Sequence, residues 1–170
     1  MITQARLKEL FEYDLEIGIF TNLCDRGRAI KGETAGWISD KGYVKTKIQG
    51  RHYYMHKLAW LYVYGIYPDE IDHKDGNKSN NVITNLRLAT RTQNCANADQ
   101  PIGASGLRGA QLNSSKSKWQ AMIQHGGQKY YLGKYDTKEE AAAVYRRAVE
   151  DMYGEFAFHK RPSTHNEGAI

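Results

Sequence analysis

The sequence is short of cysteine, proline and long apolar runs, and each shortage excludes a class of protein. Two cysteines cannot form a disulfide framework or a four-cysteine zinc site. Three prolines exclude a proline-rich linker protein. No apolar run reaches the roughly 18 residues that cross a membrane, and the first residues lack the apolar core of a secretory signal. We therefore expect a cytoplasmic protein with no structural zinc and no membrane partner.

Basic residues outnumber acidic ones, 24 to 19, and the excess is unevenly distributed. Residues 21–61 carry eight basic and three acidic side chains, and residues 100–135 carry five basic side chains and no acidic one. Two separate acid-poor stretches predict two surfaces that could meet a phosphate backbone. The alternative for each stretch is an ordinary solvated face.

An asparagine-rich segment follows the apolar region at 56–64 and contains the pair Asp72–His73. A carboxylate is a hard oxygen ligand that suits Mg²⁺ or Mn²⁺, and a histidine can take a proton from water. Neighbouring side chains of a strand face opposite sides, so both can serve one site only if the strand twists or ends there. Residues 74–77 are typical of a turn. Thr90 and Gln93 fit a capping box, which places Asn94 in the first turn of a helix where its amide could complete a metal site.

Residues 42–97 resemble the HNH (ββα-metal) nuclease motif, in the H-N-N variant of phage and intron-encoded homing endonucleases. The match rests on Asp72–His73, on Asn85 twelve residues after the histidine and on Asn94 twenty-one after it. The resemblance implies an α+β nuclease domain in which Asp72 and Asn94 bind one divalent metal ion, Mg²⁺ or Mn²⁺. It further implies that His73 is the general base and that Asn85 holds the loop that orients His73.

Other side chains near this motif could contact DNA. The alternating strand at 43–49 and its hairpin carry Lys45, Lys47 and Arg51. His56 opens an apolar helix, and a packed or capping histidine is as plausible there as a phosphate contact. Arg87 could bind a phosphate or pair with a nearby carboxylate, that of Asp75. The first helix is expected at residues 5–13.

Residues 101–106 are small and flexible, which is typical of a linker. We therefore expect a nuclease domain at 1–100, a second domain at 107–160 and a tail at 161–170. Three strand patterns and one capped helix follow the linker. The expected fold class is α+β, a ββα-metal domain followed by a three-stranded antiparallel sheet packed on one helix.

The second domain resembles the AP2 DNA-binding domain. The resemblance lies in Arg108–Gly109, Lys118–Trp119, and the stretches at 131–137 and 139–142. It implies a three-stranded sheet in the major groove, backed by one helix. For the aromatic residues Trp119 and Tyr131, packing alone is the alternative to a DNA contact. The expected DNA contacts are Arg108, Gln111, Asn113, Trp119, Gln124, Lys129 and Tyr131.

These patterns predict a metal-dependent endonuclease, a phage homing endonuclease by resemblance, that hydrolyses double-stranded DNA as a nick or a double-strand cut. The C-terminal domain would aid the choice of the DNA site. We expect no small-molecule cofactor. A monomer and a homodimer both remain open, and a phage-encoded protein would act in the bacterial host cytoplasm. The alternative function is a sequence-specific DNA-binding regulator whose nuclease domain is silent.

Overall fold

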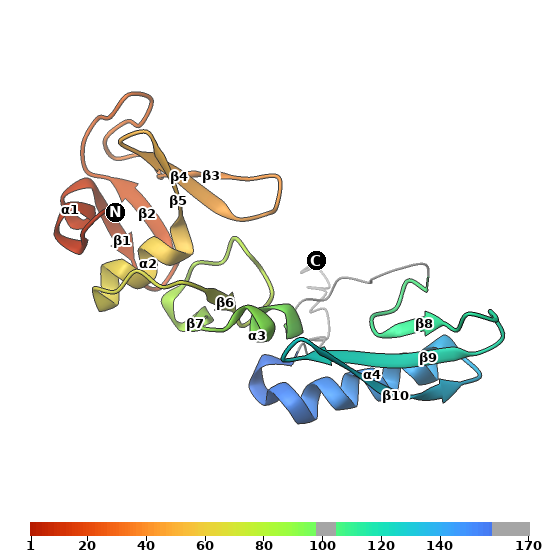
Figure 1. Cartoon of the computed structure of the whole chain (residues 1–170). Helices are drawn as coiled ribbons and strands as arrows, with labels where there is room; N and C mark the ends of the chain where they lie inside the picture. Colours follow the sequence, from red (N-terminus) through yellow and green to blue (C-terminus); the bar gives the residue numbers. More distant parts are fainter. Residues whose placement is uncertain (98–104, 158–170) are drawn as a thin grey trace, which may run out of the picture. The chain divides into compact units, whose positions relative to one another are not determined.

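A computed structural model describes residues 1–97 and 105–157 (Figure 1). The chain divides into two compact units, one of Met1–Asn94 and one that begins at Cys95. Of the expected linker at 101–106, residues 101–104 lie outside the described residues, as do residues 158–160 and the expected tail at 161–170. Each unit contains small antiparallel sheets and few helices, which confirms the α+β class.

The first unit opens with α1 (Gln4–Leu10) and a hairpin of β1 (Phe11–Asp14) and β2 (Ile19–Asn22). The expected helix at 5–13 was too long by three residues. From Phe11 onward, buried aromatic side chains alternate with exposed acidic ones, with Phe11 and Tyr13 buried. This period of two suits a strand that pairs with β2, and the tertiary pairing overrides the helical pattern.

A three-stranded sheet of β3 (Trp37–Ile38), β4 (Val44–Ile48) and β5 (Arg51–Tyr54) follows, in the order β3-β4-β5. It leads into α2 (Met55–Tyr64), which ends at Gly65 in a left-handed conformation that favours glycine. The helix packs its buried apolar residues into one core with α1 and the first hairpin. The two strands that follow along the chain are anchored in this core.

The third part of the unit is a ββα arrangement. Strand β6 (Ile71–His73) pairs antiparallel with β7 (Leu86–Leu88), a short 3-10 turn (Ile83–Asn85) precedes β7, and α3 (Arg91–Ala96) follows it. Ile71 and Leu86 anchor the two strands in the core. The asparagine-rich loop is therefore held between the end of β6 and the start of β7.

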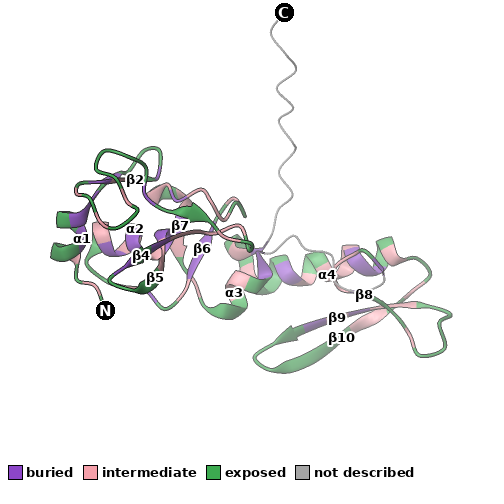
Figure 2. Ribbon diagram, turned by 90° about the horizontal axis from the view of Figure 1, so that it is seen from above, coloured by how far each residue is buried: buried purple, intermediate pink, exposed green. Residues whose placement is uncertain are grey.

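The second unit is a three-stranded sheet packed on one helix, as the sequence predicts. Its strands are β8 (Ala110–Leu112), β9 (Trp119–His125) and β10 (Gln128–Tyr135), in the order β10-β9-β8. Helix α4 (Lys138–Tyr153) begins with a capping box between Thr137 and Glu140 and is followed by a 3-10 turn (Gly154–Phe156). Strand β10 is exposed along most of its length (Figure 2).

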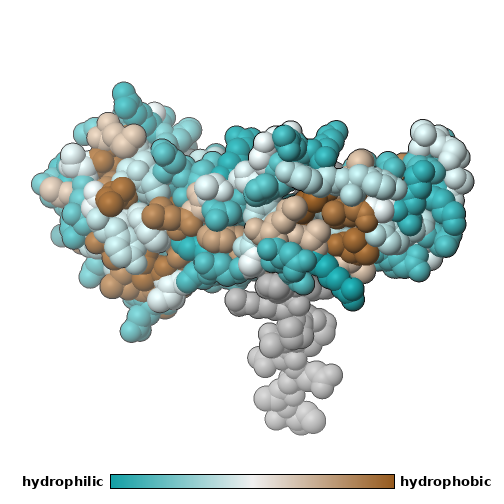
Figure 3. Space-filling view, turned by 60° about the horizontal axis from the view of Figure 1, so that its bottom comes forward, coloured by the Kyte–Doolittle hydropathy of each residue, from teal (hydrophilic) through white to brown (hydrophobic). Residues whose placement is uncertain are grey.

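Surface polarity agrees with the composition. The face drawn in Figure 3 is mostly hydrophilic, with apolar side chains in small patches. None of the helices within residues 1–97 and 105–157 has the length and apolar character that spanning a membrane requires.

Candidate active site

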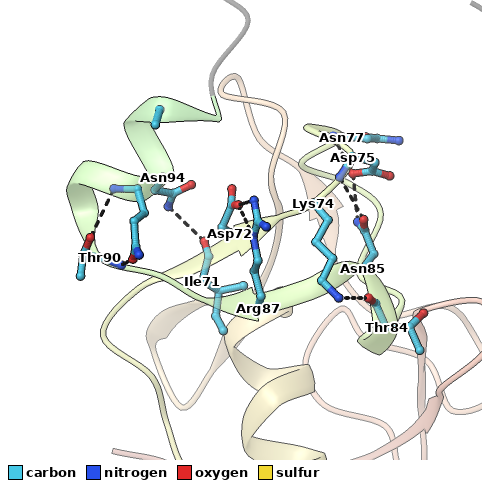
Figure 4. A network of polar contacts seen from close by, with 12 residues as sticks. Ile71, Asp72, Lys74, Asp75, Asn77, Thr84, Asn85, Arg87, Thr90 and Asn94 are labelled. Atoms are coloured by element: carbon cyan, nitrogen blue, oxygen red, sulfur yellow. Dashed lines mark hydrogen bonds and ion pairs between the residues drawn. The ribbon is translucent and has the colours of Figure 1, made fainter. Parts of the chain in front are cut away.

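Strand β6 buries two ionisable side chains side by side in sequence. Asp72 is 2% exposed and His73 is 4% exposed. A buried carboxylate is costly unless it is paired. Arg87, directly opposite Asp72 in the β6–β7 register, provides the partner, with Nε and Nη2 at 2.8 and 2.7 Å from Asp72 Oδ2 (Figure 4). The sequence suggested a phosphate or Asp75 for Arg87, and the structure instead shows an ion pair with Asp72.

Helix α3 brings Asn94 to the same strand. Thr90 and Gln93 form the expected capping box, with Gln93 Oε1 accepting from Thr90 N at 2.8 Å and Thr90 Oγ1 accepting from Gln93 N at 3.3 Å. Asn94 Nδ2 donates to the carbonyl of Ile71 at 3.1 Å (Figure 4). Because the NH₂ end is bound to the residue before Asp72, the amide orientation of Asn94 is set by β6.

Asp72 and Asn94 offer a carboxylate and an amide oxygen, both hard donors. Among the described residues, no group of three or more His, Cys, Asp or Glu side chains is placed to hold a metal ion. An ion such as Mg²⁺ keeps several waters and takes only one or two protein carboxylates when substrate phosphates complete its coordination. The pair therefore fits a hydrated hard cation and does not fit an all-protein cage.

His73 lies in a different environment from that of Asp72. Its ring packs edge-on against His56, with centroids 5.0 Å apart, and its Nε2 is 3.3 Å from Asn81 Oδ1. Burial lowers the pKa of His73, although the contact with Asn81 and the carboxylates of Asp75 and Asp72 act in the opposite direction. The imidazole is therefore neutral near pH 7, which is the form that can accept a proton.

His56 is part of the support of His73 and is too buried to contact a phosphate. It is 4% exposed, and its ring lies against Tyr43, Tyr54 and His73. Burial, followed by the nearby charges of His73 and Lys57, lowers the pKa of His56 to about 3. Of the two alternatives for this residue, the structure selects packing.

Asn85 closes the loop between β6 and β7. Its Nδ2 donates to Asp75 Oδ1 and to the carbonyl of Asn80, both at 2.9 Å, and its Oδ1 accepts from the backbone N of Asp75 at 3.1 Å. Its own carbonyl accepts from Lys74 N at 2.9 Å. Asn85 thus fixes both the start and the end of the turn that follows His73.

Asn81 is the side chain at this site that sequence analysis missed. It is 3% exposed and contacts His73 directly. The sequence marks it only as one of several asparagines in a loop, and nothing in its spacing distinguishes it from Asn77 or Asn80.

The basic residues of the β4–β5 hairpin do not share one face. Lys45 pairs with Tyr54 and Lys47 pairs with His52, on the face opposite the buried Thr46. Arg51 lies opposite Ile48, which is buried, so it belongs to the other face of the hairpin. Lys45 and Lys47 are therefore the expected DNA contacts of this hairpin that share a face, and a DNA contact from Arg51 stays a separate prediction.

The sheet of the second unit divides the expected DNA contacts by face. Ala121 and Ile123 of β9 are buried toward the helix. Residues directly opposite one another in an antiparallel pair share a face. Three cross-strand sets therefore lie on the outer face, and this face includes three side chains that sequence analysis did not select. The sets are Gln111–Gln120–Lys134, Met122–Tyr131 and Gln124–Lys129.

Three expected contacts do not belong to that face. Trp119 packs against the alanine cluster beneath α4, which was the alternative considered for it. Arg108 donates to the backbone carbonyls of Cys95 and Ala96. Asn113 Oδ1 accepts two backbone N–H groups of the β8–β9 turn, at 2.9 and 3.3 Å. These three side chains shape the unit, whereas Tyr131 is 56% exposed and remains on the outer face.

Comparisons with known proteins show which proteins this chain is similar to. Residues 53–96 match the family model described as HNH endonuclease. The chain is 31% identical over 123 residues to "Uncharacterized HNH endonuclease L560" of Acanthamoeba polyphaga mimivirus, an alignment that covers 71% of this chain and 64% of the mimivirus protein. It is 34% identical over 88 residues to "Protein 3.8" of Escherichia phage T7, covering 51% of this chain and 72% of the phage protein. No solved structure matches the chain. Residues 53–96 therefore carry an HNH endonuclease domain, and the chain is similar to a viral protein named as an HNH endonuclease.

Proposed function

We propose that this protein is a metal-dependent endonuclease that hydrolyses phosphodiester bonds in double-stranded DNA. The observation that carries the proposal is the β6–β7–α3 unit, which holds a neutral buried histidine next to a carboxylate and an amide. Asp72 and His73 alternate along the strand, so a phosphate that meets both must lie where β6 ends at His73. The turn at 74–77 begins at that point and is fixed by Asn85.

Asp72 and Asn94 would hold one divalent ion, Mg²⁺ or Mn²⁺. When bound, such an ion supplies Lewis-acid stabilisation of the negative charge on the scissile phosphate. Arg87 is ion-paired with the buried carboxylate of Asp72, and it must share that carboxylate with the ion. Arg87 is then a residue of the metal site and not an independent DNA contact.

His73 would be the general base. Its ring is neutral, buried and oriented from two sides, by His56 and by Asn81. General-base catalysis typically contributes about 10²–10⁴-fold to a rate. Asn85 acts on His73 indirectly, because it closes the loop that carries Asn81.

The second unit would select the DNA site, as an AP2-like domain. Its outer face carries Gln111, Gln120 and Gln124 with Lys129 and Lys134, and glutamine can pair bidentately with adenine in the major groove. No acidic residue lies between positions 100 and 135, so the face is complementary to a phosphate backbone. The viral relatives, together with the H-N-N spacing, favour a phage-type homing endonuclease, active in the host cytoplasm.

The rival function is a DNA-binding regulator with a silent nuclease domain. Supercoiled phage DNA incubated with the protein and Mg²⁺, Mn²⁺ or EDTA distinguishes the two. We expect open circles or linear fragments only with metal, with 5′-phosphate and 3′-hydroxyl ends. The ratio of nicked to linear product reports a nick against a double-strand cut.

His73→Ala tests the residue assignment. It should abolish metal-dependent cutting while a gel shift on the same DNA is retained. His125→Ala is the matched control, since this exposed histidine contacts Tyr153 in the second unit and should leave cutting unchanged. Intact DNA in every lane with a salt-sensitive gel shift would favour the regulator.

A further inference from the structure

Asn81 links His73 to the N-terminal hairpin. Its side-chain oxygen is 3.3 Å from His73 Nε2, and its backbone carbonyl accepts from the hydroxyl of Tyr13 at 2.6 Å in a buried hydrogen bond. Tyr13 lies on β1, 68 positions earlier in the sequence. Asn81 therefore connects the N-terminal hairpin to His73, the proposed general base.

The turn of the same hairpin also lies close to the backbone of Asn81. Gly18 has φ +71°, and a Cβ there would lie 2.3 Å from Val82 N and 2.5 Å from the carbonyl carbon of Asn81. A residue other than glycine would be strained in this conformation and would also push the loop away. Tyr13 and Gly18 thus fix the backbone of Asn81 from two directions.

The contact at the side chain has a chemical consequence. An amide oxygen can only accept a hydrogen bond, so the nitrogen of His73 that faces it must carry the hydrogen. A neutral imidazole has one N–H, which leaves Nδ1 as the nitrogen with the lone pair. A general base in the opposite tautomer would present an N–H where it has to accept a proton. Burial raises the pKa of the Tyr13 phenol, which therefore stays a donor throughout the working pH range.

We propose that Asn81, braced by Tyr13 and Gly18 of the N-terminal hairpin, is a positioning residue that fixes His73 in its Nε2–H tautomer so that Nδ1 is the base. The inference rests on the proposed role of His73 in DNA cleavage. Under this proposal the first 22 residues support the reaction by positioning His73, although they supply no catalytic group themselves. Asn81 does not touch the reacting atoms, and its effect is on kcat and not on DNA affinity.

The test combines a spectrum with kinetics. Two-bond ¹H–¹⁵N correlation spectra of the imidazole rings report the tautomer of His73 without reference to activity. The wild type should show the Nε2–H form. Asn81→Leu, which keeps the size of the side chain but removes the acceptor, should lose that preference. Asn81→Asp, which keeps an acceptor, should retain it.

Rates of plasmid cleavage give the second readout. Loss of the hydrogen-bond partner of a metal-ligating histidine typically costs about 10–100-fold in activity, and we expect Asn81→Leu to lower kcat by a similar factor with KM nearly unchanged. Asn81→Asp should restore most of kcat. Tyr13→Phe should lower kcat by less. Its control is Tyr62→Phe, whose ring packs on Tyr13 with centroids 5.6 Å apart but whose hydroxyl makes no hydrogen bond among the described residues.

The outcomes separate the inference from the proposed function. A wild-type protein that does not cut DNA overturns the proposed function, and the tautomer spectrum still decides the inference. An Nδ1–H tautomer in the wild type overturns the inference, as does an Asn81→Leu variant that cuts at the wild-type kcat. If Asn81→Leu fails to fold, the wild-type spectrum and the comparison of Tyr13→Phe with Tyr62→Phe give the decision.

Discussion

Replacing Arg87 with methionine tests whether the ion pair with Asp72 holds the site together when no metal is bound. Methionine keeps much of the aliphatic packing and removes the charge. Asp72 and Arg87 have side chains only 3% and 12% exposed. Removing one partner of a buried pair leaves an uncompensated charge and costs about 3–5 kcal/mol. Against a usual domain stability of about 5–15 kcal/mol, this loss is large.

Urea unfolding in EDTA measures the loss. A Trp119→Phe background leaves Trp37 and Trp60 as the tryptophan reporters, both in the first unit, so the fluorescence change follows the unit that contains Arg87. The double variant Asp72→Leu with Arg87→Met is the control. It removes both charges together, and replacement of a buried ion pair by apolar residues is often neutral or stabilising. It should therefore be more stable than Arg87→Met alone.

Metal ions provide the second arm. A cation bound to Asp72 replaces the charge that Arg87 supplied, so Mg²⁺ should stabilise Arg87→Met more than the wild type. Two results would refute the reasoning. One is a cost of less than about 1 kcal/mol in EDTA, because the pair would then behave like a solvated surface pair. The other is an equal cost with and without Mg²⁺, because Asp72 would then not be a metal ligand.

Two further predictions follow from the burial of particular side chains. His56 has a pKa of about 3 in the folded protein against 6.5 for the unfolded chain, so the unfolded state binds the extra proton between these values. The contribution of neutral His56 to the free energy of unfolding is fully present above pH 6.5 and is lost as the pH falls toward 3. At 1.36 kcal/mol per pH unit, the loss is about 3 kcal/mol at pH 4.5. His56→Gln should flatten this pH dependence, which urea titrations at pH 7.5 and 4.5 would measure. In the second unit, Trp119→Ala should cost about 2–4 kcal/mol of stability because the ring packs beneath α4. Its neighbour Gln120 faces outward, so Gln120→Ala should change stability by less than about 0.5 kcal/mol. The same variant should weaken specific DNA binding by about 1–3 kcal/mol. Equal effects of Trp119→Ala and Gln120→Ala on DNA binding would contradict the assignment of the two faces.

Sequence patterns were most informative where a local rule fixes the outcome. The capping box of Thr90 and Gln93 depends on residues a few positions apart, and the structure confirms it. The first helix ended early because the pairing of Phe11 and Tyr13 with β2 decided the conformation, and no local pattern contains that pairing. The three-stranded sheet of the second unit was predicted for the same reason as the capping box, from alternation and turn residues.

Sequence patterns did not determine side-chain positions that depend on strand register or on a distant partner. Trp119 and Gln120 are adjacent in sequence, and the strand places one under the helix and the other on the outer face. The spacing of Asp72, His73, Asn85 and Asn94 describes a loop and says nothing of what supports it. The hydrogen bond between Tyr13 and Asn81 spans 68 residues, and only the fold brings its ends together. If Asn81 fixes the tautomer of His73, the spacing motif is necessary for catalysis but incomplete, because a chain that kept all four motif residues and lost the N-terminal hairpin would present the wrong nitrogen to the water.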